Sequence, residues 1–121
     1  MTTINLSTTA LNDYTVEDLV TLKAAAAQHA EDAAMAHLAQ YGEHAYCGFA
    51  WVNIWGIKGN TKLGKRMKAA GFEKDYTGAY NIWNPSTLGT QCMSTKEAGA
   101  RACASVFKKY GFECSAGSRA D

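Results

Sequence analysis

The chain has 121 residues, of which 47% are hydrophobic and 19% are charged, as expected for a single globular domain. No apolar run approaches the roughly 20 residues that span a bilayer, and the first residues lack the basic and apolar stretches of a secretory signal. We therefore expect a cytoplasmic protein. Its four cysteines, Cys47, Cys92, Cys103 and Cys114, should be free thiols there, because no pair forms a C-x-x-C motif.

The net charge of +1 conceals an uneven distribution. Residues 1–43 contain one basic and six acidic residues, whereas residues 44–121 contain eleven basic and five acidic residues. The basic part could face an anion, or it could meet the acidic part of another subunit.

The first third of the chain predicts one long helix. Residues 1–13 are polar and are expected to form a loose arm. Thr15 and Asp18 have the spacing of a capping box, and no glycine or proline follows until Gly42, so we predict a helix over residues 15–41. Its alanine-rich middle favours close packing, either on the sheet of the same subunit or on a second copy. The second alternative predicts a homo-oligomer through residues 15–41.

Residues 44–117 predict an α+β core with the order β-α-β-α-β and a small sheet. The expected elements are a strand from 44 to 55, a helix from 62 or 63 to 70, a strand from 79 to 83, a helix from 94 to 110 and a short strand from 112 to 115. A capping box of Ser94 with Glu97 would begin the second of these helices. Asn53-Ile54-Trp55 recurs as Asn81-Ile82-Trp83, either through duplication or by coincidence. We expect a single domain over residues 1–121.

A basic segment follows the first strand. Its positive side chains are Lys58, Lys62, Lys65, Arg66, Lys68 and Lys74. Glycine amides with lysines beside them can hold phosphates, although Arg66 occupies the hydroxyl position of a Walker A loop and removes that motif. The alternative is a solvated basic surface. A phosphate site requires that this segment folds into a concave, positively charged surface.

Aromatic residues flank the basic segment on both predicted strands. They are Phe49, Trp51, Trp55, Tyr76, Tyr80 and Trp83. They could belong to the core, stack on the bases of a ligand, or form a subunit interface. Arg119 lies in a tail that is either a loose end or reaches the same anion. The predicted ligand-binding residues are Lys58, Asn60, Lys62, Lys65, Arg66, Trp51, Trp55 and Arg119.

No motif predicts a self-sufficient catalytic site. His29 and His37 lie about 12 Å apart along a helix, and His44 and Cys47 point to opposite faces of a strand. There is no G-x-S-x-G or H-E-x-x-H sequence. We expect no metal and no cofactor, and an enzyme would need a site built at a subunit interface.

Several short blocks resemble a family of small tailed-phage proteins over roughly residues 44–121. The blocks are 47–52, 59–62, 83–86, 96–102 and 117–119 with Asp121. The resemblance implies a phage or prophage origin and expression in the bacterial cytoplasm. It carries over no activity and no functional residue. Small phage proteins without catalytic motifs often block host machinery or sequester host signalling nucleotides.

These observations favour a non-enzymatic binding module for a phosphate-bearing ligand, a nucleotide or nucleic acid. Such a module could act against host defence signalling. The alternative is an inhibitor that binds a host protein through its aromatic residues. A small hydrolase with a site at a subunit interface is a third, weaker alternative.

Overall fold

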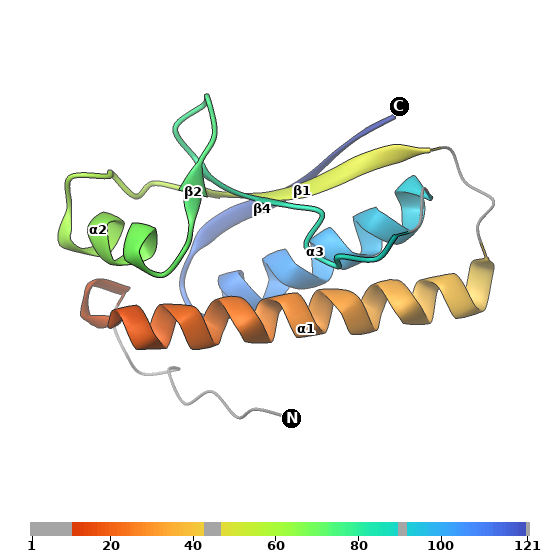
Figure 1. Ribbon diagram of the computed structural model, residues 1–121, viewed down its shortest axis with the longest axis horizontal. Helices are drawn as coiled ribbons and strands as arrows, with labels where there is room; N and C mark the ends of the chain where they lie inside the picture. Colours follow the sequence, from red (N-terminus) through yellow and green to blue (C-terminus); the bar gives the residue numbers. More distant parts are fainter. Residues whose placement is uncertain (1–10, 43–46, 90–91, 121) are drawn as a thin grey trace.

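Helices cover one face of a four-stranded sheet, and none of the described elements lies on the other face. The computed structural model describes residues 11–42, 47–89 and 92–120. The long helix α1 (Val16–Tyr41) runs along the molecule, and α3 (Met93–Lys109) lies between it and the sheet (Figure 1). A short helix, α2 (Lys62–Ala69), lies beyond one end of the sheet. The predicted α+β fold, with its long N-terminal helix, is confirmed.

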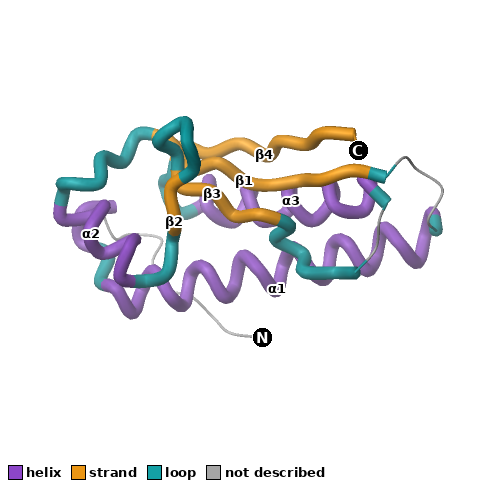
Figure 2. The backbone as a smooth tube through the Cα atoms, turned by 45° about the horizontal axis from the view of Figure 1, so that its top comes forward, coloured by secondary structure: helices purple, strands orange, loops and turns teal. Residues whose placement is uncertain are grey.

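The sheet is antiparallel and has the order β2-β3-β1-β4. Its strands are β1 (Gly48–Trp55), β2 (Glu73–Lys74), β3 (Tyr80–Trp83) and β4 (Glu113–Ala120). After α1 the chain therefore runs β-α-β-β-α-β, with β1 and β3 in the centre of the sheet. The two-residue strand β2 is an addition to the predicted order. Figure 2 shows the strands on one side of the molecule and α1 and α3 on the other.

The helix α1 begins where the sequence predicts. Thr15 Oγ1 accepts from the amide of Asp18, and the Asp18 carboxylate accepts from the amide of Thr15, which forms the predicted capping box. The helix ends at Gly42, which has a φ of 69°. Its buried side chains include Ala26, Ala30 and Ala34. These alanines lie on the side of α1 that packs along α3 of the same subunit.

Strand β1 supplies the centre of the core. Ala50, Val52 and Ile54 alternate along it and are fully buried beneath the helices. They pack with Phe107 of α3 and with Phe72, which precedes β2. The small and branched side chains on this face allow α3 to approach the sheet closely, as the sequence predicts.

Three details differ from the sequence-based expectations. Leu11–Asp13 forms a turn of 3-10 helix, and Leu11 packs against the core, so this part of the predicted loose arm is structured. Residues 1–10 lie outside the described residues. Helix α3 begins at Met93 with Cys92 as its N-cap and no side-chain cap; Glu97 instead accepts a hydrogen bond from Ser118. The last strand continues to Ala120, because it pairs with the whole of β1.

Candidate functional site

The open face of the sheet carries most of the aromatic surface that the strands expose. We call it the aromatic face. Alternation along the strands directs its side chains away from the helices. Its members are Phe49, Trp51, Asn53 and Trp55 on β1, Asn81 and Trp83 on β3, and Glu113, Ser115, Gly117 and Arg119 on β4. The two central strands therefore supply all four aromatic residues.

Three rings of the aromatic face form one cluster around Trp83. Trp83 lies parallel to Trp51, with ring centroids 5.6 Å apart and an interplanar angle of 0°. Its centroid lies 5.4 Å from that of Phe49. The cause is the register, which places Trp51 directly opposite Trp83 across the two central strands. Trp83 is 54% exposed, so much of its ring is available to a ligand.

Polar groups continue the aromatic face toward the end of β1. Asn81 Nδ2 donates to Asn53 Oδ1 at 3.0 Å, and the two residues are cross-strand partners. Beyond them, the indole Nε1 of Trp55 donates to Ser115 Oγ at 3.3 Å. A carboxamide pair offers both donors and acceptors. The arrangement can therefore combine ring stacking with hydrogen bonds to the edge of a planar ligand.

Charges of both signs border the aromatic face. The guanidinium of Arg119 lies 5.7 Å from the centre of the Phe49 ring. The buried Nζ of Lys96 lies 5.4 Å from the same ring and donates to the carbonyl of Gly48 at 2.9 Å. At the other end, Glu113 faces Trp55 across the strands. Cations thus gather at the Phe49 end, whereas a carboxylate lies at the Trp55 end.

The loop that begins the basic segment is closed by hydrogen bonds between its own residues. Thr61 Oγ1 donates to the carbonyl of Lys58 and accepts from the amide of Gly64, so the loop caps α2 with its own side chain. A Cβ atom on Gly64 would lie 2.2 Å from the Lys58 carbonyl oxygen, so this glycine serves close packing. The side chains of Lys58, Asn60, Lys62 and Lys65 are exposed around the loop and helix.

The predicted site residues separate into three groups. Trp51, Trp55 and Arg119 lie on the aromatic face. The exposed residues of the basic segment follow β1 beyond Trp55, and Lys74 joins them, because its Nζ approaches Gly59. Arg66 forms the third group by itself, since it is half-buried and its Nη1 donates to the carbonyl of Tyr14.

Arg119 lies far from the basic segment. It pairs with Phe49 near the start of β1, whereas the basic segment follows the end of that strand. Eight residues of strand span about 26 Å. Arg119 therefore belongs to a strand and not to a loose tail, and it lies at the opposite end of the aromatic face from Lys58.

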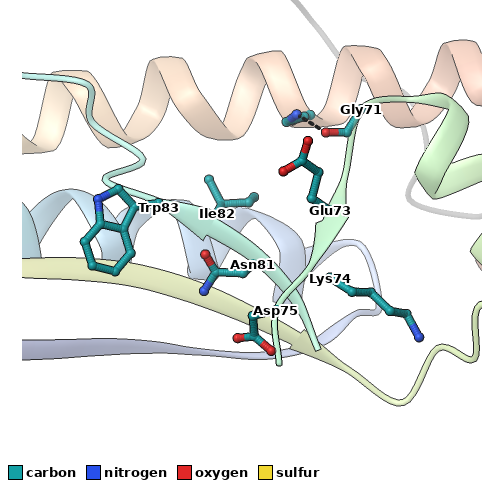
Figure 3. A pocket seen from close by; sticks show the side chains of 8 residues that line it. Gly71, Glu73, Lys74, Asp75, Asn81, Ile82 and Trp83 are labelled. Atoms are coloured by element: carbon teal, nitrogen blue, oxygen red, sulfur yellow. Dashed lines mark hydrogen bonds between the residues drawn. The ribbon is translucent and has the colours of Figure 1, made fainter. Parts of the chain in front are cut away.

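A groove of about 390 Å³ lies beside the short strands, between Gly71–Asp75 and Asn81–Trp83. Lys23 closes one side, and its Nζ donates to the carbonyl of Gly71 at 2.8 Å. Figure 3 shows Glu73 directed toward Gly71, whereas Lys74 points away from it. Trp83 lines this groove and also belongs to the aromatic face. None of the predicted ligand-binding residues lines it.

Sequence reasoning missed Trp83 and the Asn53–Asn81 pair as members of one surface. The repeated Asn-Ile-Trp sequence contains the signal, because it places equivalent residues on two strands. The repeat does not reveal the register of the two strands, which places Asn81 opposite Asn53 and Trp83 opposite Trp51.

Two further chemical features of the described residues concern possible metal ligands and a buried thiol. Within residues 11–42, 47–89 and 92–120, no three His, Cys, Asp or Glu side chains are placed to hold a metal ion. Burial raises the pKa of Cys103 to about 12, with a further contribution from neighbouring Cys114. Cys103 is therefore protonated at neutral pH, and a protonated thiol is a poor nucleophile.

Comparison of the chain with protein-family models, with curated proteins and with solved structures found no match. Among the described residues, no helix has the length and apolar character needed to cross a membrane.

Proposed function

We propose that this chain is a non-enzymatic module that binds single-stranded nucleic acid, or a nucleotide, on its aromatic face. The observation that carries the proposal is the ring cluster on the two central strands of the sheet, in which Trp83 is exposed and Trp51 and Phe49 are partly exposed. Nucleobases stack on such rings, and each stacked base contributes about 1–3 kcal/mol.

The topology supports the same ligand class by analogy. RNA-recognition modules built on a four-stranded sheet stack two or three bases on aromatic side chains of the sheet. Here the rings of Phe49 and Trp51 on β1 and of Trp83 on β3 have comparable places. A shared topology does not establish a shared function. The support for this ligand class therefore comes from the three rings themselves.

Base edges and phosphates have candidate partners along the same path. The Asn53–Asn81 pair lies next to the rings and can bond the edge of a base. Arg119 at one end of β1, and Lys58 with Lys62 beyond the other, can each contact a phosphate. In this proposal the lysines act as separate contacts along an extended strand of the ligand.

Binding of labelled single-stranded oligonucleotides, followed by fluorescence anisotropy and tryptophan quenching, tests the proposal. Trp83→Ala should weaken binding by about tenfold to a hundredfold. The matched control is Tyr41→Ala, which removes an equally exposed ring from α1. Lys62→Ala should weaken binding less, and chiefly at low salt. Equal binding by Trp83→Ala and Tyr41→Ala would contradict the proposal.

A protein partner is the second candidate, and the carboxylates of the aromatic face favour it. Glu113 and Glu73 lie at its rim, where they would repel phosphates. An aromatic centre with a charged rim is also typical of protein interfaces. If no oligonucleotide or nucleotide binds at low salt, this candidate replaces the first. In that case Trp83→Ala should abolish capture of the partner, whereas Lys62→Ala should leave it unchanged.

A further inference from the structure

Strand β4 presents an open edge of unusual length and composition. It is the last strand of the sheet, and within the described residues no strand pairs with its outer edge. Its eight residues, Glu-Cys-Ser-Ala-Gly-Ser-Arg-Ala, contain no lysine or proline, and six of them are exposed apart from Cys114 and Gly117. Proteins usually protect such edges with charges, proline, bulges or a covering segment. A long edge whose charges lie only near its two ends, at Glu113 and Arg119, is suited to pairing with another strand.

We propose that β4 pairs with β4 of a second copy of this chain, antiparallel and about a two-fold axis at Ala116. A two-fold axis perpendicular to the sheet preserves its faces, so only residues on the same face become partners. In this register Ala116 faces Ala116 of the second copy and Ser115 faces Gly117. Cys114 faces Ser118, so every pair near the axis is small. The two sheets then form one sheet of eight strands.

The charges of β4 indicate that its partner strand is β4 of a second copy. Glu113 and Arg119 lie on the same face of β4, six residues apart, so they are about 20 Å apart and do not meet within one strand. In the proposed register each Glu113 lies directly opposite Arg119 of the other copy. Opposite charges at cross-strand positions stabilise a pair of strands, and like charges destabilise it. The edge is therefore complementary to itself, with two ion pairs for each dimer.

The helices leave room for this arrangement. Ala116 and Ser118 point toward the helix side of the sheet, yet both are exposed. Helix α3 packs on β4 but does not cover its outer edge. Figure 2 shows β4 along the outside of the sheet.

Pairing through β4 would also join two aromatic faces. Trp51 lies over Gly117, and Trp55 bonds Ser115. Because Gly117 faces Ser115 of the second copy, Trp51 of one subunit comes beside Trp55 of the other. This consequence follows from the register of the dimer and does not rest on the proposed function.

Light scattering coupled to size exclusion, with no nucleic acid present, tests the dimer. The wild-type protein should approach a mass of about 26 kDa, twice the 13.0 kDa of the chain, as its concentration rises. Glu113→Arg and Arg119→Glu should each raise the dissociation constant by about tenfold or more. The double variant Glu113→Arg/Arg119→Glu restores both pairs with exchanged charges and should dimerise like the wild type. Glu17→Arg makes the same charge change on α1 and should have no effect.

Two results would overturn the proposal. One is a wild-type protein that stays monomeric throughout the concentration range. The other is a dimer that both single variants leave intact, or that the double variant fails to restore. Loss of the dimer on Val20→Glu alone would place the interface on the exposed side of α1 instead. Hydrogen exchange supplies an independent reading, since the amides of β4 that point away from β1 should become protected as the dimer forms.

Discussion

The indole of Trp51 occupies the space above Gly117. A Cβ atom at position 117 would lie 2.6 Å from Trp51 Nε1 and 2.7 Å from its Cε2. Trp51 has two cross-strand partners, which are Gly117 on β4 and Trp83 on β3. A residue without a side chain on β4 therefore lets the Trp51 ring extend over that strand and lie parallel to Trp83.

Gly117→Ala should displace Trp51 and disturb its stacking on Trp83. Distances below 3.0 Å require the ring to move, whereas the backbone at position 117 accepts alanine without a positive φ. We expect the far-ultraviolet circular dichroism to stay unchanged and the near-ultraviolet signal of the tryptophans to change. Oligonucleotide affinity should fall by about tenfold. Gly89→Ala is the control, because no atom of the described residues lies within 4 Å of a Cβ atom there; similar behaviour of both variants would contradict this account.

Gly99→Ala should destabilise the protein although alanine is the better helix former. A Cβ atom at position 99 would lie 2.8 Å from Cβ of the buried Ser86 and 3.2 Å from the carbonyl oxygen of Ala30 on α1. Overpacking costs about 1–3 kcal/mol, against a gain of up to about 1 kcal/mol in helix propensity. The free energy of unfolding in urea should therefore fall by about 1 kcal/mol. An increase would show that α1 and α3 separate easily.

Thr15→Ala should reduce the free energy of unfolding by about 1 kcal/mol, the usual contribution of an N-cap side chain. The lost contact is the hydrogen bond that Thr15 Oγ1 accepts from the amide of Asp18. Thr15→Ser keeps the oxygen and should retain most of the stability. Equal losses in the two variants, measured in urea, would mean that the methyl group and not the cap matters.

The elements that the sequence predicts well are those determined by neighbouring residues. The capping box of Thr15 and Asp18 spans four residues, and the alternation of β1 is visible within the strand itself. Both predictions are confirmed. The capping box predicted for Ser94 and Glu97 is wrong, because Glu97 accepts from Ser118 of β4 and the helix begins one residue earlier. A tertiary contact replaced a local one.

The features that could not be predicted depend on contacts between distant residues. Residues 116–120 have small and polar side chains with weak strand propensity, and they form a strand because all of β1 is available as their partner. Arg66 was predicted to bind a ligand, but it reaches a carbonyl 52 positions earlier in the chain. The stacking of Trp83 on Trp51 follows from the pairing of β1 with β3, and a sequence pattern does not determine that register.

The stability of the fold should fall between about pH 9 and pH 12, and Cys103 should account for part of the loss. Burial raises the pKa of this thiol from 9.0 to about 12. The unfolded chain therefore loses the thiol proton at a lower pH than the folded protein does, so ionisation favours unfolding as the pH rises through this window.

The same sign holds for Tyr14, whose pKa burial also raises from 10.0. Urea unfolding of Cys103→Ala should show a shallower decline of stability above pH 9 than the wild type, each measured relative to its own value at neutral pH. Cys47→Ala removes an exposed thiol and should follow the wild-type profile. Parallel profiles for all three proteins would contradict this account, because Cys103 would then ionise alike in the folded and unfolded chains although its side chain is buried on α3.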